Sequence, residues 1–295
     1  MGLGLEDRLR GFLVELIRLA TTRLPRDVYE ALERALEAED NPLARMQLEA
    51  ILENSRLAAR LGRPICQDTG APFFYLRVGD GFPLRSRLYD VAREAVREAT
   101  RTVPLRPNAV DPLRGRNSGD NTGRYTPWVE VELVPGESLE AVYAPKGGGS
   151  EAPTGLYMAL PLEGVGAVHR AVLETVAGAG PRACPPFVVG VGVAATGDQA
   201  LALAKRALLL RRLGERHPDP EAAELEEKLL REVNELGLGA HGFGGRVTAL
   251  DLHLEYGHRH PATYAVGVVL SCWALRRASG VFMPDGSWRI TSSHI

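Results

Sequence analysis

The sequence contains only three cysteines among 295 residues, and no two of them are close along the chain. Cys66, Cys184 and Cys272 cannot all pair with one another, and their wide separation excludes a CxxC motif of the zinc or thioredoxin type. Thiols that pack as small apolar side chains are one interpretation. Ligation of an iron–sulfur cluster is the other, because three thiolates on a four-iron cube would leave one iron open to substrate.

The chain also lacks strong net charge and long apolar runs. It contains only three lysines, Lys146, Lys205 and Lys228. Its formal net charge of −2 excludes the electrostatic footprint of a nucleic-acid or anionic-membrane binder. No run reaches the roughly 18 apolar residues of a membrane span, and residues 1–20 are typical of an amphipathic helix, unlike a signal peptide. We therefore expect a cytoplasmic protein with no nucleic-acid or membrane partner, in a compartment that keeps thiols reduced.

Hydrophobic periodicity predicts a mixed α/β fold. We expect one domain over residues 1–295, in which a helical layer at 1–62 packs on a mixed β-sheet body at 63–295 that carries the candidate site. Strands are expected at 73–78, 129–134, 139–144, 187–194 and 247–255, followed by a longer apolar stretch at 264–274. Helices are expected at 88–100, 165–177, 199–213 and 219–235. A Pro-Gly turn between 129–134 and 139–144 predicts a hairpin, and Pro284-Asp-Gly286 predicts a second one.

Two polar segments follow the helical layer. Cys66-Gln-Asp-Thr-Gly70 places a thiol, an amide and a carboxylate in one tight turn. An ordinary turn would explain Asp68 and Gly70, but it would leave the Cys-Gln pair unexplained. Residues 105–122 hold arginine and asparagine at a density that suits carboxylate binding, because arginine grips carboxylates through two parallel hydrogen bonds. Without further information, a solvated loop is the simpler interpretation.

Three glycine-rich segments have different interpretations. Lys146-Gly-Gly-Gly-Ser150 follows a predicted strand and offers backbone N–H groups to an anion, although it is not a P-loop. Phe187–Gly197 resembles a dinucleotide fingerprint, but its spacing is wrong and the expected acidic residue is absent. Its glycines are expected to let the strand approach something bulky near Cys184. A further cluster at His241–Gly245 precedes a predicted strand, and His260 lies 12 residues before Cys272.

Together these motifs resemble the class I, iron–sulfur-dependent fumarate hydratase and L-tartrate dehydratase family, specifically the alpha subunit of its two-subunit members. The resemblance runs in family order from about residue 63 to the end of the chain. Its motifs are Ile65-Cys-Gln-Asp-Thr-Gly70, Pro104-Leu-Arg-Pro-Asn108, Asn117-Ser-Gly-Asp-Asn-Thr122, Pro145-Lys-Gly-Gly-Gly-Ser-Glu151, Cys184-Pro-Pro-Phe-Val-Val-Gly-Val-Gly192, Gly242-Phe-Gly-Gly-Arg-Val-Thr-Ala-Leu250, and His260 with Cys272.

The resemblance implies that Cys66, Cys184 and Cys272 ligate a [4Fe–4S] cluster with one open iron. It implies that Asp68 shares in proton transfer at the substrate hydroxyl. The residues that it implies for substrate contact are Gln67, Arg106, Gly148, Gly149 and His260. Ala152, Gly123 and His241 depart from the family pattern, but none of them removes an implied ligand.

The activity implied first is reversible hydration of fumarate to (S)-malate, with the open iron as Lewis acid. A separate beta subunit is expected to complete the active site in an α2β2-type assembly, since single-chain members continue into a domain that is not expected here. The alternative substrates are L-tartrate, mesaconate and citramalate. From another class, the chain could be a non-catalytic iron–sulfur subunit, or a zinc protein whose ligands are the three cysteines and His260.

Overall fold

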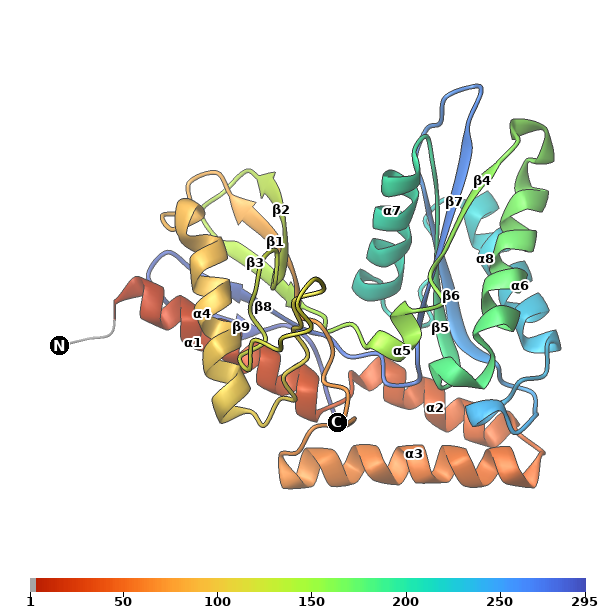
Figure 1. Cartoon of the computed structure of the whole chain (residues 1–295), viewed down its shortest axis with the longest axis horizontal. Coiled ribbons are helices and arrows are strands. Elements are labelled where there is room, and N and C mark those ends of the chain that lie inside the picture. The colour runs from red at the N-terminus through yellow and green to blue at the C-terminus, as the bar shows by residue number, and fades with distance from the viewer. Residues whose placement is uncertain (1–3) are drawn as a thin grey trace. The chain divides into compact units, whose positions relative to one another are not determined.

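The computed structural model describes residues 4–295 and confirms the predicted mixed α/β class. Contacts divide the chain into two compact units. Among the described residues, the first unit comprises 4–26, 54–147 and 276–295, and the second comprises 27–53 and 148–275. Among the helices of residues 4–295, none is both long and apolar enough to cross a membrane. Each unit contains one β-sheet with helices packed against it (Figure 1).

The first unit contains a five-stranded sheet of order β2-β1-β3-β8-β9. Helices α1 and α4 pack on this sheet and share its core. The bounds of these elements are α1 Leu5–Thr22, β1 Phe73–Gly79, α4 Leu88–Thr102, β2 Trp128–Val134, β3 Leu139–Tyr143, β8 Ala278–Phe282 and β9 Trp288–Ile290. The predicted C-terminal hairpin is confirmed, because β8 and β9 pair antiparallel around the turn at Pro284-Asp-Gly286.

The hairpin predicted for β2 and β3 is wrong. Strand β1 lies between them, pairing parallel with β2 and antiparallel with β3. The turn at Pro135-Gly136 therefore carries the chain across the end of β1, where Gly79 donates its N–H to the Ser138 carbonyl at 2.9 Å. A short connection between two apolar strands does not reveal that an earlier strand separates them.

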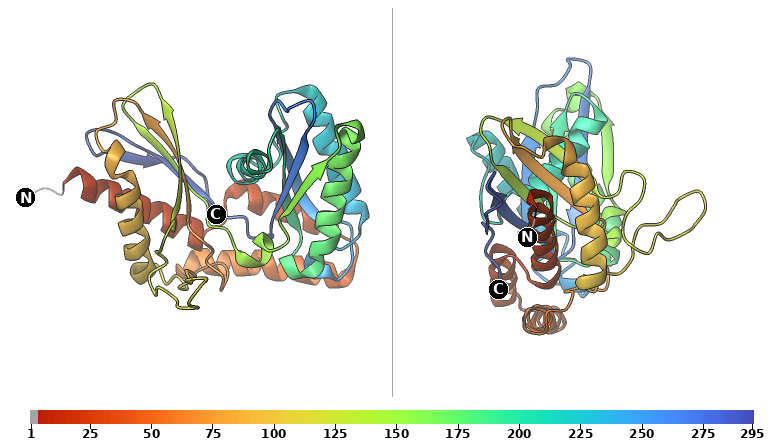
Figure 2. Two further views of the ribbon diagram at one scale, coloured as in Figure 1. Left: turned by 45° about the horizontal axis from the view of Figure 1, so that its top comes forward. Right: turned by 90° about the vertical axis from the view of Figure 1, so that its left-hand side faces the viewer.

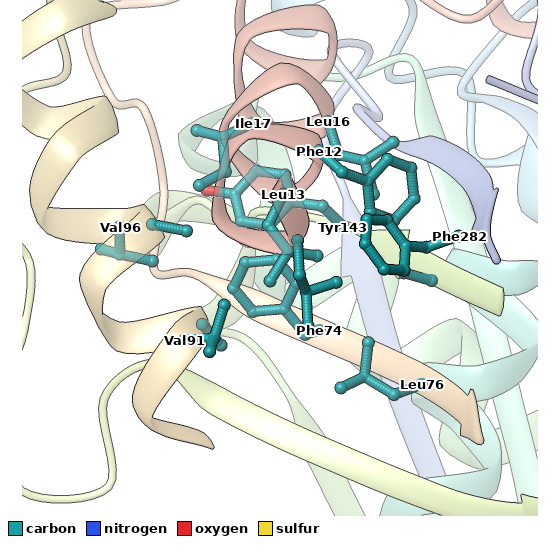
Figure 3. Packing of buried hydrophobic residues seen from close by; sticks show 14 of the residues in the cluster. Phe12, Leu13, Leu16, Ile17, Phe74, Leu76, Val91, Val96, Tyr143 and Phe282 are labelled. Atoms are coloured by element: carbon teal, nitrogen blue, oxygen red, sulfur yellow. The ribbon is translucent and has the colours of Figure 1, made fainter. Parts of the chain in front are cut away.

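The core of the first unit forms where α1 and α4 meet the sheet (Figure 3). Apolar residues at helical spacing on α1, from Leu9 to Ile17, are all buried, as the periodicity predicts. Aromatic pairs connect the layers: Phe12 of α1 lies 5.8 Å from Phe282, and Phe74 of β1 lies 5.0 Å from Tyr143, measured between ring centroids. Burial of each large apolar side chain contributes about 2 kcal/mol, so this layer fixes β1 and the segment that precedes it.

The second unit contains a four-stranded sheet of order β4-β7-β5-β6. Helix α7 packs on one face, while α6 and α8 pack on the other (Figures 1 and 2). The bounds are α5 Gly148–Glu151, β4 Gly155–Ala159, α6 Val165–Ala179, β5 Phe187–Ala194, α7 Gly197–Leu210, α8 Pro220–Glu235, β6 Ala249–Tyr256 and β7 Tyr264–Ser271. Of the remaining helices, α2 spans Arg26–Ala38, and α3 spans Pro42–Leu61 with residues in both units.

The glycines of β5 serve helix packing. A Cβ on Gly190 would overlap the carbonyl oxygen of Ala204, and one on Gly192 would overlap that of Ala200. The expectation that these glycines face something bulky near Cys184 is therefore wrong, because the backbone of α7 occupies the space. This close contact also explains the resemblance to a dinucleotide fingerprint, since a third glycine there has the same packing role.

We predict that Gly192→Ala lowers the free energy of unfolding by about 3 kcal/mol, since the new methyl group has no room against α7. The matched control is Gly178→Ala within α6, where nothing lies within 4 Å of the added carbon. That change should stabilise the helix by about 0.5–1 kcal/mol. Urea denaturation of both variants measures the difference. Equal stability of the two variants would contradict the packing role.

Candidate functional site

The turn that contains Cys66 is fixed on both sides in the first unit. Ile65 donates its N–H to the Thr21 carbonyl at 3.0 Å, and the Asn54 side chain donates to the Ile65 carbonyl at 2.9 Å. After the turn, Ala71 and Lys146 exchange two backbone hydrogen bonds of 2.9 and 3.0 Å. The thiol of Cys66 therefore lies on a segment that the fold holds at both ends.

Asp68 closes this turn, and its contacts hold it next to the arginine loop. Its Oδ1 accepts hydrogen bonds from the Gly70 N–H at 2.9 Å and from the Asn108 side chain at 3.2 Å. Gly70 has φ +84, a left-handed conformation that glycine adopts without strain. The sequence predicted the Asx turn, but the contact from Asn108 depends on a loop that is distant along the chain.

Asparagines hold Arg106 beside the turn. Asn121 is only 3% exposed; its Oδ1 accepts from the Asn108 N–H at 2.6 Å, and its Nδ2 donates to the Arg106 carbonyl at 3.2 Å. The same carbonyl accepts from the Thr69 hydroxyl at 3.3 Å. Most of the loop at residues 105–122 is exposed and extends away from the sheet (Figure 2). Its buried asparagine nevertheless positions a functional candidate, a role that sequence reasoning missed because Asn also dominates ordinary turns.

These contacts produce a cavity of about 370 Å³ within the first unit. Its walls include three predicted site residues, Cys66, Gln67 and Arg106. The other lining residues are Pro64, Thr69, Pro104 and Leu105. The structure thus brings a thiol, an amide and a guanidinium group together from two separate segments, as a site for a carboxylate ligand requires.

In the second unit, Cys184 and Cys272 lie at the same end of the sheet. Strands β5 and β7 are antiparallel, with Val188 paired to Ser271, so the start of β5 lies beside the end of β7. The Trp273 N–H donates to the Cys184 carbonyl at 3.3 Å. Cys184 is exposed and has φ +55, an uncommon conformation for a residue with a side chain. Such strained positions occur at ligand sites, where the surrounding fold holds them.

Two glycine segments border this end of the second unit. A Cβ on Gly149 would lie 3.6 Å from the Arg182 carbonyl, which places the Gly148–Gly149 backbone beside the loop of Cys184. On the other side, the His241 N–H donates to the Pro185 carbonyl at 2.9 Å. The side chain of His241 bonds to Gln47 at 3.2 Å, and its partial burial lowers the pKa of the imidazole. His241 therefore holds the cysteine loop in place, although the sequence marked it only as a departure.

His260 lies at the opposite end of the same sheet. It precedes β7, whereas Cys272 follows that strand, and eight strand residues span about 26 Å. The loop of His260 bonds to the far end of β5, where the Thr263 hydroxyl donates to the Ala195 carbonyl at 2.9 Å. A zinc site that combines Cys272 with His260 is therefore wrong for one chain. The substrate contact of His260 stays a prediction, and within its own unit β7 separates His260 from Cys272.

The thiols meet the chemical requirements of an iron–sulfur cluster. Within residues 4–295 no cysteine is in a disulfide, and none is fully buried. Cys184 and Cys272 lie on loops at strand ends, and Cys66 lies in the turn between α3 and β1, where thiolates can reach a ligand. Across the same residues, no three His, Cys, Asp or Glu side chains are grouped to hold a single metal ion. Cys66 belongs to the first unit, and Cys184 and Cys272 belong to the second.

Comparison with known proteins agrees with these features. The profile of the family described as fumarate hydratase (Fumerase) matches residues 12–281. A Methanocaldococcus jannaschii protein, provisionally assigned as an L(+)-tartrate dehydratase subunit alpha, is 42% identical over 275 residues, covering 92% of this chain and 96% of its own length. The L(+)-tartrate dehydratase subunit alpha of Escherichia coli strain UTI89 is 38% identical over 274 residues, which are 92% of this chain and 90% of that protein.

The chain therefore belongs to the family of class I fumarate hydratases and L-tartrate dehydratase alpha subunits. Membership confirms the predicted resemblance and the enzyme class, a hydro-lyase. It does not favour the substrate expected first, because the named relatives are tartrate dehydratases.

Proposed function

We propose that this chain is the alpha subunit of an L(+)-tartrate dehydratase that works with a separate beta subunit. The observation that carries the proposal is the similarity to alpha subunits of that name over nine-tenths of their length. The cavity that joins Cys66, Gln67 and Arg106 supports it from the structure. An α2β2-type assembly and a cytoplasmic location belong to the same proposal.

The reaction removes water from a four-carbon dicarboxylate that carries two hydroxyl groups. One C–O bond and the C–H bond of the neighbouring carbon break, and the resulting enol rearranges to the ketone oxaloacetate. The difficult part is to remove a weakly acidic C–H proton while hydroxide leaves. A site for this reaction must therefore bind two carboxylates, stabilise the leaving oxygen and move a proton.

The residues of this chain would divide that work. Arg106 would bind a substrate carboxylate, and Gln67 and the N–H groups of Gly148–Gly149 would orient the molecule. Asp68 would hold or move the proton of the substrate hydroxyl, because its turn and the Asn108 side chain hold the carboxylate in place. Cys66, Cys184 and Cys272 would hold a [4Fe–4S] cluster, which when bound supplies a Lewis acid that eases loss of hydroxide. The base at carbon would come from the beta subunit.

We expect the chain, assembled anaerobically with its partner subunit, to dehydrate L(+)-tartrate with a kcat/KM at least about tenfold above that for (S)-malate or fumarate. A tenfold ratio corresponds to about 1.4 kcal/mol of preferential transition-state binding, which one hydroxyl contact can supply. The chain without its partner should be inactive. Ultraviolet absorbance measures both results, through the oxaloacetate formed from L(+)-tartrate and the fumarate formed from (S)-malate or consumed by hydration. Robust activity from the isolated chain would overturn the two-subunit proposal.

Fumarate hydratase remains the second candidate, favoured by the description of the family profile. It makes the opposite prediction in the same assay, a kcat/KM for fumarate above that for L(+)-tartrate. Exposure to air distinguishes either hydro-lyase from a non-catalytic subunit. The activity should fall in air and return after anaerobic treatment with iron and sulfide.

A further inference from the structure

Arg276 is a buried cation that sequence reasoning did not single out. Its side chain is 3% exposed, and within residues 4–295 its Nε and Nη1 have no hydrogen-bond partner. It lies in the first unit, just before β8. The start of β8 pairs with the end of β3, where Ala278 lies opposite Tyr143. Burial raises the pKa of the Tyr143 phenol, and the charge of Arg276 opposes that rise. The guanidinium group therefore lies inside the unit at the end of these strands.

The space beside Arg276 is shared with Asp68. The two hydrogen bonds between Ala71 and Lys146 bring the segment after the Cys66 turn alongside the segment that contains Gly147. A Cβ on Gly147 would lie 3.2 Å from Oδ2 of Asp68 and 3.9 Å from Nη2 of Arg276. Both charged groups therefore border the small space that the missing side chain of Gly147 leaves open.

The buried guanidinium beside this space favours an anionic ligand. Arg276 is 3% exposed, and its Nη2 is the cationic atom that borders the space. Asp68 is the carboxylate that the structure places at the Gly147 space with Arg276. Leaving guanidinium N–H groups without acceptors in a buried position is costly. A carboxylate supplies acceptors of the right charge and planar geometry for arginine.

We propose that Arg276 binds one carboxylate of the dicarboxylate substrate in the space beside Gly147. This placement rests on the proposed function and deepens it, because it assigns a second carboxylate contact besides Arg106. It also places the substrate next to the carboxylate of Asp68, which is proposed to exchange a proton with the hydroxyl. Arg276 is then a substrate-binding residue.

The test is binding of succinate, a four-carbon dicarboxylate without a hydroxyl group to eliminate, to the assembled two-subunit protein by calorimetry. Arg276→Met should weaken succinate binding about 10- to 100-fold, the effect of losing a hydrogen bond to a charged group. The variant should also lose the wild-type preference for succinate over its half-amide, succinamate. A folding defect would not alter that preference selectively. The control is Arg77→Met on β1, a half-exposed arginine paired with Glu140 at 2.8 Å, which should bind succinate as wild type does.

Gly147→Ala provides a second test that leaves Arg276 in place. Its methyl group would enter the space between Asp68 and Arg276, so succinate binding should weaken at least tenfold. If either folded variant bound succinate with wild-type affinity and kept the wild-type preference for succinate over succinamate, the proposal would be overturned. Ordered water would then be the partner of the guanidinium. Absence of succinate binding to wild type would overturn it as well. Carboxylate-dependent succinate binding in a protein that dehydrates no dicarboxylate would support the binding role while the proposed function fails.

Discussion

A Cys184→Ser variant, assembled anaerobically with its partner subunit, is expected to lose roughly 1,000-fold in hydro-lyase activity. The reason is that a hydroxyl group is a poor substitute for a thiolate ligand, and a Lewis acid at the leaving oxygen contributes several kcal/mol. Iron and sulfide content should fall together with the broad absorbance near 400 nm that iron–sulfur proteins show. Cys66→Ser and Cys272→Ser should behave in the same way, since all three thiols are assigned to one cluster.

The control for this experiment is Arg182→Ser on the same exposed loop. Its side chain donates a hydrogen bond to the Gly178 carbonyl at 2.7 Å, and it has no thiol. Iron content in that variant should match wild type. Cluster content and turnover at wild-type levels in any of the three cysteine variants would refute the assignment of that cysteine as a ligand.

Asp68→Asn is expected to lower kcat about 100- to 10,000-fold, the range for loss of a positioned proton-transfer group. Asparagine keeps an oxygen that can accept from the Gly70 N–H, so the turn should persist while the carboxylate charge is lost. KM for the substrate should change much less than kcat. Steady-state kinetics of the assembled protein measure both quantities.

Asp111→Asn is a matched control, because Asp111 closes a similar turn on the exposed loop. Its Oδ1 accepts from the Leu113 and Arg114 N–H groups at 2.9 and 3.1 Å. The hydrogen bonds from Arg114 lower the pKa of Asp111, yet the residue does not line the cavity of Cys66 and Arg106, so its loss should leave kcat unchanged. If Asp68→Asn turned over as fast as Asp111→Asn, Asp68 would have no part in proton transfer.

Elements with strong local patterns could be predicted from the sequence, whereas strand partners could not. The continuous apolar run at Phe187–Ala194 gave β5 its observed bounds, and the amphipathic spacing of residues 165–177 predicted α6 within two residues. Strand β4 was missed, because Gly155–Ala159 has only five residues and no alternation of apolar and polar side chains. The position of β1 between β2 and β3 depends on contacts between distant segments, which local periodicity does not encode.

The candidate site shows the same division. The three cysteines and the turn of Asp68 stand out in the sequence because their residue types are unusual together. The roles of Asn121, His241 and Arg276 could not be recognised, because each acts through a contact with a residue far away along the chain. The zinc site that would combine His260 with Cys272 is the reverse case: the two residues are 12 apart in the sequence, but a full strand separates them in space.

The central position of β1 has a consequence for how the site adapts to its ligands. Hydrogen bonds to β2 and β3 protect both edges of this strand, so its amide hydrogens should exchange with solvent only when the unit unfolds. The exposed residues 112–119 should exchange much faster, which hydrogen–deuterium exchange can verify. If Asp68 acts as proposed, the segment before β1 would hold it in one orientation for each substrate, while the exposed loop after Arg106 would adjust to diacids of different shape.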